Sequence, residues 1–80
     1  MKLTKLSTTG NFTELEVSSM LYVYFSYETP IALVKNGEVI VTENNWGPTT
    51  GKHINALKRM HPQHEIVPHD NLMFTISITI

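Results

Sequence analysis

The 80-residue sequence contains no cysteine and little charge, with six Lys and Arg against seven Asp and Glu, or 16% of the chain. Soluble domains average about 25% charged residues. The lack of cysteine excludes a disulfide framework, an iron–sulfur cluster, a thiolate zinc site and a cysteine nucleophile. The net charge of −1 argues against a long nucleic acid as partner, because proteins that bind one neutralise many phosphates with a basic face.

Long apolar runs are also missing. The longest one, from Met20 to Phe25, covers six residues, whereas a helix that spans a bilayer needs about 20. Lys2 and Lys5 near the N-terminus are not followed by an apolar run of signal-peptide length. We therefore expect no membrane association and a cytoplasmic location.

The length predicts a single small domain that covers residues 1–80. A lone core of this size rarely supplies more than about 3–5 kcal/mol unless disulfides or oligomerisation add to it. Because disulfides are excluded, self-association is the expected source of additional stability, and we predict a homo-oligomer.

Short alternating segments predict strands. Apolar residues alternate with glutamates over residues 12–17, and Leu3–Thr8 is a weaker partner strand that a turn at Gly10–Asn11 would join to it. Residues 20–27 are rich in β-branched and aromatic side chains on both faces. This pattern indicates a central strand whose second face is covered by a helix, a ligand or a second chain.

Asn36–Gly37 lies between two apolar runs and is a strong hairpin signal, because both turn positions require positive φ. Faultless alternation over residues 72–80 predicts a long final strand, whose unpaired edge would support self-association. The predicted fold is therefore α+β, with a small antiparallel sheet of about four to five strands and one helix packed on one face.

The single expected helix starts at an N-cap formed by Thr49 or Thr50 and runs to about Met60. It must stop near His61, since Pro62 disfavours α geometry in the residue before it. We expect its apolar stripe to consist of Ile54, Leu57 and Met60. Its polar stripe should consist of Lys52, Asn55 and Arg59.

The segment from Trp46 to His53 is the most informative stretch, because glycines there lead into the helix N-terminus. Free backbone N–H groups and the helix dipole meet two threonines, a lysine and a histidine, a combination that suits an anion. The P-loop motif needs four residues between its first glycine and the Gly-Lys pair, but three separate Gly47 from Gly51. A nucleoside triphosphatase is therefore a poor interpretation, and an ordinary capped helix is the alternative to an anion site.

The aromatic residues of the 20–27 strand supply stacking surface, and such platforms bind nucleobases with about 1–3 kcal/mol per base. With six basic residues in the chain, a single small nucleotide fits better than a polymer. We predict that Tyr24 and Trp46 stack on this ligand. The anion would be held by Thr49, Thr50, Lys52 and His53, and the rim completed by Ser26, Tyr27 and Thr29. The alternative, that the rings belong to the core and an interface, stays open.

The four histidines show no metal-ligand spacing, because Pro62 and Gln63 separate His61 from His64 and no HExxH motif occurs. His53 differs from the others, since it falls in the first helical turn, where the dipole lowers the pKa of an imidazole. We predict no metal site and no cofactor, and we name no catalytic residue. An enzyme that uses His53 is a third hypothesis.

Two segments, residues 24–32 and 45–55, carry a resemblance to a protein family. They contain Ser-Tyr-x-Thr-Pro-Ile-Ala in the strand pair and Thr-Thr-x-Lys-His at the helix start. In this order the motifs are similar to those of short, uncharacterised proteins encoded by phages of Gram-positive bacteria and by related prophages. The resemblance covers residues 20–58, carries no known activity and implies a phage or mobile-element origin. The matching positions are Ser26, Tyr27, Thr29, Pro30, Thr49, Thr50, Lys52, His53 and Asn55.

Together, the residues and the resemblance predict a small, non-enzymatic binding protein that captures a small anionic, nucleotide-like ligand and so counters host defence signalling. The alternative is a protein-interaction module that inhibits a host factor through its aromatic surface. The first hypothesis predicts that Lys52→Ala and His53→Ala abolish nucleotide binding without unfolding the chain. The second predicts that substitution of exposed tyrosines abolishes capture of a partner protein.

Overall fold

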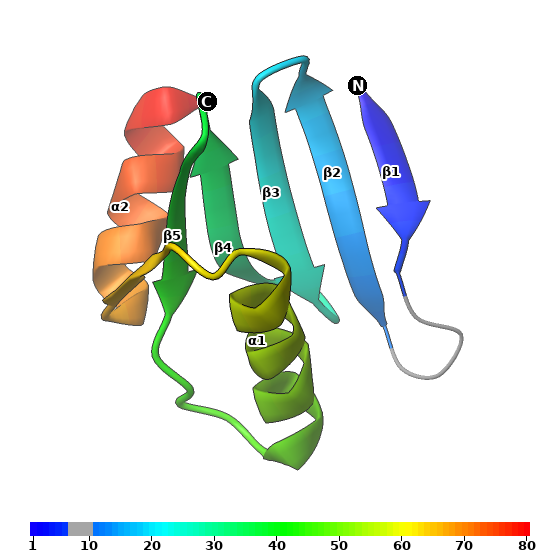
Figure 1. The fold of residues 1–80 in the computed structure, drawn as a ribbon, viewed down its shortest axis with the longest axis vertical. Helices are drawn as coiled ribbons and strands as arrows, with labels where there is room; N and C mark the ends of the chain where they lie inside the picture. The colour runs from blue at the N-terminus through cyan, green and yellow to red at the C-terminus, as the bar shows by residue number, and fades with distance from the viewer. Residues whose placement is uncertain (7–10) are drawn as a thin grey trace.

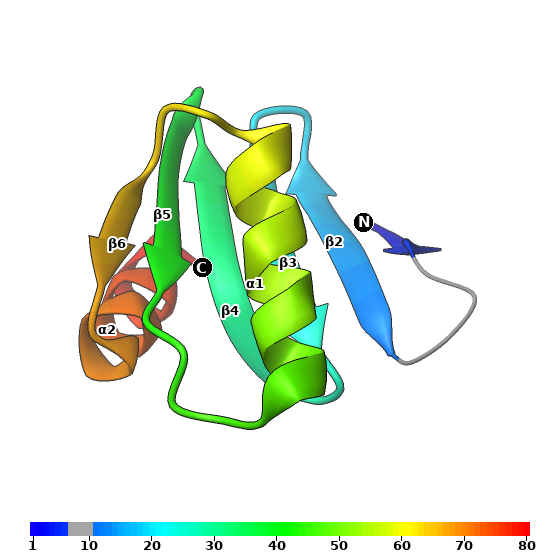
Figure 2. The ribbon, with the colours of Figure 1, turned by 60° about the horizontal axis from the view of Figure 1, so that its bottom comes forward.

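The computed structural model describes residues 1–6 and 11–80, and within them the chain forms one six-stranded sheet and two helices. The strands follow the chain order across the sheet (Figures 1 and 2). They are β1 (Lys2–Lys5), β2 (Phe12–Ser18), β3 (Leu21–Ser26), β4 (Thr29–Lys35), β5 (Glu38–Thr42) and β6 (Glu65–Val67). The first five pair antiparallel, while β6 pairs parallel to β5. The α+β class is confirmed, but the described residues contain more strands, and one more helix, than predicted.

The hairpin between β4 and β5 forms where the sequence predicts it. Asn36 and Gly37 have φ angles of 51° and 84°, the left-handed conformation that a tight two-residue hairpin requires. The preceding turn, between β3 and β4, is also tight and holds Tyr27 at a φ of 56°. The Tyr27 N–H donates to the carbonyl oxygen of Asn11 at 2.6 Å, which ties this turn to the start of β2.

Helix α1 (Pro48–Met60) connects β5 to β6 and ends where Pro62 predicts, with His61 as its C-cap. Its N-cap is Gly47 rather than Thr49 or Thr50, so that prediction is wrong. Pro48 occupies the first turn, where its missing N–H costs no helical hydrogen bond. The buried side of α1 consists of Thr50, His53, Ile54 and Leu57, whereas Met60 is exposed; the predicted polar stripe, Lys52, Asn55 and Arg59, is exposed as expected.

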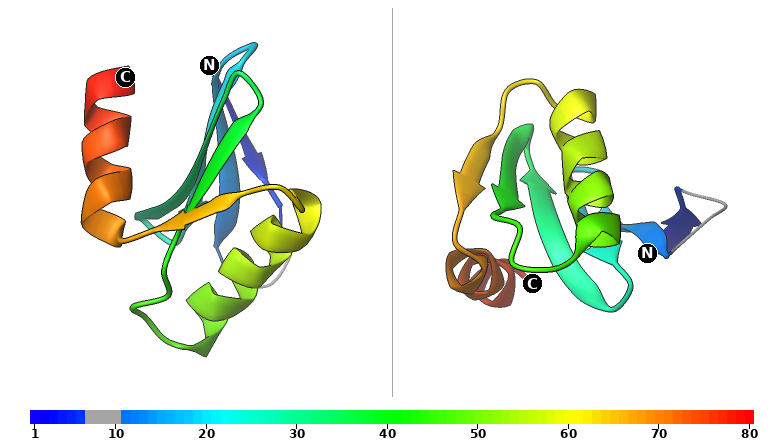
Figure 3. Two further views of the ribbon diagram at one scale, coloured as in Figure 1. Left: turned by 60° about the vertical axis from the view of Figure 1, so that its left-hand side comes forward. Right: turned by 90° about the horizontal axis from the view of Figure 1, so that it is seen from below.

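The sheet has a core on each face, because α1 and α2 (His69–Thr79) lie on opposite sides of it (Figure 3). On the α1 side the core consists of Phe12, Tyr24, Ile31, Ala32, Val41, Ile54 and Leu57. On the α2 side a smaller core consists of Val23, Leu33 and Leu72. This arrangement explains why β3 carries large side chains on both of its faces.

The C-terminal segment is the main departure from the sequence prediction, since residues 72–80 form most of α2 and not a strand. Leu72 and Ile76 lie on the same face in a strand and also on the same face in a helix, so their spacing fits both structures. Pro68 precedes the helix as its N-cap. The hydroxyls of Thr75 and Ser77 donate back to the carbonyl oxygens of Asn71 and Phe74 on the exposed side of the helix.

Two smaller differences concern the edges of the sheet. The sequence did not predict β6, a three-residue strand that follows α1 and covers the edge of β5. The predicted N-terminal strand, Leu3–Thr8, is present as β1, but residues 7–10, and with them Gly10 of the predicted turn, lie outside the described residues. Neither helix of the described chain is both long and apolar enough to cross a bilayer.

Candidate functional site

A buried polar cluster joins the end of β3 to the first turns of α1. Its members are Ser26, Thr50 and His53, and the Ser26 side chain is only 1% exposed. The Ser26 hydroxyl lies 2.9 Å from Thr50 Oγ1 and 2.7 Å from His53 Nδ1. The imidazole also stacks on Phe12, with ring centroids 4.7 Å apart and planes 10° from parallel. Hydrogen bonding and stacking therefore fix His53 in one orientation.

The cluster is a neutral hydrogen-bonded network that joins β3 to α1. Burial lowers the pKa of His53 below its ordinary value, so the imidazole is neutral near pH 7. A relay in which Thr50 donates to Ser26 and Ser26 donates to Nδ1 satisfies all three groups. The Ser26 hydroxyl lies at the distance expected of a nucleophile beside its base, but it is enclosed in the core.

The two aromatic residues that were predicted to stack on a ligand lie at opposite ends of α1. Tyr24 is 4% exposed, and its hydroxyl donates to Glu14 Oε2 at 2.6 Å. Burial, then this hydrogen bond and the charge of Glu14, raise the pKa of Tyr24. Its ring approaches His61, after the last turn of α1. Trp46 precedes the first turn, and its ring is nearly perpendicular to that of His69, with the two centroids 4.8 Å apart.

The remaining predicted residues surround the N-terminal end of α1. Tyr27 is 50% exposed, with its ring centroid 6.3 Å from that of His53. Thr49 and Lys52 are exposed on the helix, and Thr29 is half-buried at the start of β4. The structure therefore brings Ser26, Thr50, His53 and Tyr27 together, while Tyr24 and Trp46 lie apart from them.

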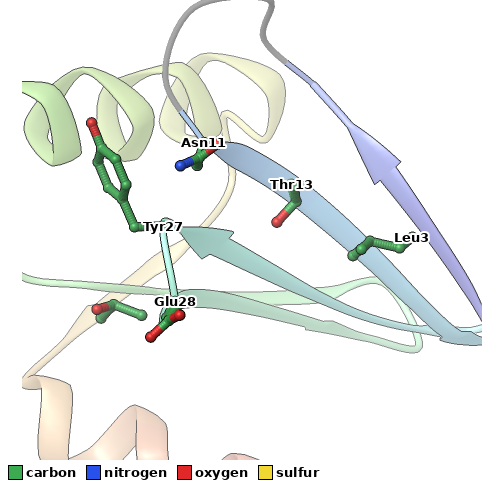
Figure 4. Close-up of a pocket in the computed structure, with 6 residues that line it drawn as sticks. Leu3, Asn11, Thr13, Tyr27 and Glu28 are labelled. Atoms are coloured by element: carbon green, nitrogen blue, oxygen red, sulfur yellow. The ribbon is translucent and has the colours of Figure 1, made fainter.

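A hollow of about 590 Å³ adjoins the turn between β3 and β4 (Figure 4). Figure 4 shows the Tyr27 ring directed toward α1, while the Glu28 carboxylate points away from it. Glu28 is the charged residue of the described lining, and its carboxylate favours neutral or cationic groups over an anion. Tyr27 and Thr29 were predicted site residues, and the other lining residues were not; the lining consists of Leu3, Asn11, Thr13, Tyr27, Glu28 and Thr29.

A second feature, which the sequence analysis missed, is the exposed apolar side of α2. Phe74 and Ile78 are 65% and 68% exposed, and lie one turn apart on the side opposite the buried Leu72. Met73 and Ile80 are also exposed. The hydroxyl groups of Thr75 and Ser77 on this helix already donate to its own carbonyls, so their burial against a partner would leave no donor unsatisfied.

The sheet beside α2 is also apolar. Helix α2 packs on β4 and β5, whereas β1 and β2 lie at the other end of the sheet (Figure 1). On the side of the sheet that faces α2, Leu3 is exposed, and Leu15, Val17, Leu21 and Phe25 are half-buried. We call these residues, together with Met73, Phe74, Ile78 and Ile80, the open apolar face.

The fold gives the structural class of the chain, and comparison with known proteins gives its family. The chain is a small α+β protein whose sheet carries a hydrophobic core on each face. Residues 1–72 match the model of DUF8033, a family of unknown function, and the chain belongs to this family. Comparison with curated proteins and with solved structures finds no match. The family match ends at Leu72, so it covers the sheet, α1 and the first residues of α2, while residues 73–80 lie beyond it.

Proposed function

We propose that this protein is a protein-interaction module that binds its partner through the open apolar face. The observation that carries the proposal is the exposure of Phe74 and Ile78 on a helix that is apolar around most of its circumference. Such helices are normally buried. A monomer rarely leaves more than a few hundred Å² of contiguous apolar surface exposed unless it binds something there.

The composition of the face supports a protein as the partner. Helix α2 has one acidic residue, Asp70 in its first turn, and no basic residue in its last turn. A helix that binds a membrane surface normally carries lysines or arginines on its polar side, and α2 has none. An aromatic and three long aliphatic side chains without charges among them are typical of the centre of a protein–protein interface.

In-cell photocrosslinking tests this function directly. A photoreactive phenylalanine analogue replaces Phe74 in one variant and Arg59, on the exposed side of α1, in the control. We expect discrete cross-linked protein species from position 74 and none from position 59. Equal or absent cross-linking at the two positions would contradict the proposal. The resemblance to phage proteins implies a host protein as a further partner class, and the mass of the product would identify it.

Anion capture at the start of α1 is the second candidate function. The helix N-terminus has no side-chain cap, so its first N–H groups are not satisfied by a capping side chain, and Thr49 and Lys52 beside them are exposed. The buried Ser26 cluster holds this turn in place. A titration with inorganic phosphate should shift the amide resonances of residues 49–51.

Two lysines on α1 make the control for that titration. Lys52→Ala should abolish the phosphate-induced shifts, whereas Lys58→Ala, at the opposite end of the helix, should leave them unchanged. Equal effects of the two substitutions, or no shifts in the wild-type protein, would rule out this candidate.

A further inference from the structure

Building on the proposed function, we infer that the partner of the open apolar face is a second copy of this chain, with Phe74 and Ile78 of one copy packed on β1–β3 of the other. The inference names the occupant of the face and therefore rests on the proposed function. Two properties of the described residues support it, the layout of the face and its area, and the charges at its margin allow one ion pair.

The layout of the face is self-complementary. Helix α2 covers the half of the sheet that contains β4 and β5, and the half that contains β1, β2 and β3 carries apolar side chains on the same side. A two-fold axis parallel to the strands exchanges these halves between two facing sheets. Each α2 then lies over the uncovered strands of the other copy, with both helices between the two sheets. A symmetric dimer of this type uses the same patch twice and closes on itself.

The area of the face is sufficient for a stable dimer. Four α2 side chains that are each one-third to two-thirds exposed present on the order of 400 Å² of apolar surface. Standard interfaces bury about 800 Å² per partner, of which a little over half is non-polar. The α2 side chains thus nearly supply the required apolar area, and Leu3, at 65% exposure, adds to it from β1.

The sheet margin of the face carries charges of both signs. On the described β1–β3 half of this side, Lys5 follows Leu3 by two residues and so lies on the same side of β1. The acidic group on α2 is Asp70. In the two-fold arrangement Asp70 of one copy faces a margin of the other copy that carries both Lys5, which can pair with it, and Glu28, which lines the hollow beside Leu3.

Molecular mass is the first test. In sedimentation equilibrium over a concentration series from micromolar upward, the wild-type chain should approach twice its 9.1 kDa mass. Phe74→Glu should weaken dimerisation at least about 30-fold, because a central aromatic anchor is lost and a charge is buried. Met60→Glu, on the exposed side of α1, is the matched control and should leave dimerisation unchanged. Circular dichroism checks that both variants remain folded.

Engineered cysteine pairs test the geometry, since the natural chain contains no cysteine to interfere. Mixing an Ile78→Cys variant with a Leu15→Cys variant should give a mixed disulfide dimer on oxidation. Mixing Ile78→Cys with Met60→Cys should not. A preference for the Met60 mixture over the Leu15 mixture, or a dimer that survives Phe74→Glu, would overturn the inference.

The outcomes separate the inference from the proposed function. A chain that stays at 9.1 kDa throughout, together with cross-links from position 74 to a protein of different mass, would overturn the self-pairing and leave the interaction function in place. A monomeric chain without cross-links at position 74 would overturn both.

Discussion

Replacing Ser26 by alanine removes the hydroxyl group that joins β3 to α1. The change deletes hydrogen bonds to Thr50 Oγ1 at 2.9 Å and to His53 Nδ1 at 2.7 Å. Both partner residues are buried, and each buried polar group left without a partner costs about 1–3 kcal/mol. We therefore expect the free energy of unfolding to fall by about 2–4 kcal/mol, a large part of the roughly 5–15 kcal/mol typical of small proteins.

Urea denaturation at neutral pH measures this loss, with the single tryptophan and circular dichroism as independent probes. Ser77→Ala is the matched control, because its hydroxyl makes a hydrogen bond of 2.7 Å to the Phe74 carbonyl on the exposed side of α2. That variant should stay within about 0.5 kcal/mol of wild type. If Ser26→Ala and Ser77→Ala cost the same, the buried cluster does not lock α1 to the sheet and the reasoning fails.

Three further predictions concern pH, the second core and the hairpin. Burial lowers the pKa of His53 in the folded state, so the unfolded chain binds a proton at this imidazole at a higher pH than the folded chain does. The free energy of unfolding should therefore fall as the pH drops below about 6.5, and His53→Gln should make that fall smaller in urea titrations at a series of pH values. Leu72→Ala should cost about 2–5 kcal/mol in urea because Leu72 is fully buried, whereas the exposed Met60→Ala should change little; similar losses would contradict the role of Leu72. Gly37→Ala should lower stability by about 1–2 kcal/mol through its φ of 84°, with Gly37→Asn less harmful in the same assay; an unaffected Gly37→Ala variant would argue against the left-handed turn.

The parts of the fold that could be predicted are those set by local backbone chemistry. Asn36 and Gly37 tolerate positive φ, so the hairpin follows from two residues, and Pro62 similarly sets the end of α1. The C-terminal helix could not be predicted this way, because Leu72 and Ile76 satisfy the strand period and the helix period together. What decides between them is packing against β4 and β5, which end 27 or more residues before α2 begins.

The candidate sites show the same division between local and long-range information. The polar residues near the start of α1 were predicted from composition, but their pairing depends on where the end of β3 meets the helix. Ser26 and His53 are 27 residues apart, and no local pattern specifies their contact. The open apolar face was hidden because residues 72–80 were assigned to a strand, on which Phe74 and Ile78 would have faced the core together with Leu72. That residues 49–53 bind an anion stays a prediction.

The most direct measurement of the central claim is an isotope-filtered nuclear Overhauser experiment on a mixture of ¹³C-labelled and unlabelled chains. It detects only contacts between copies, so contacts within one chain do not interfere. The account predicts intermolecular signals between Phe74 or Ile78 of one copy and Leu15 or Leu21 of the other. Intermolecular signals confined to the exposed side of α1, or none at concentrations where the chain is fully folded, would contradict it.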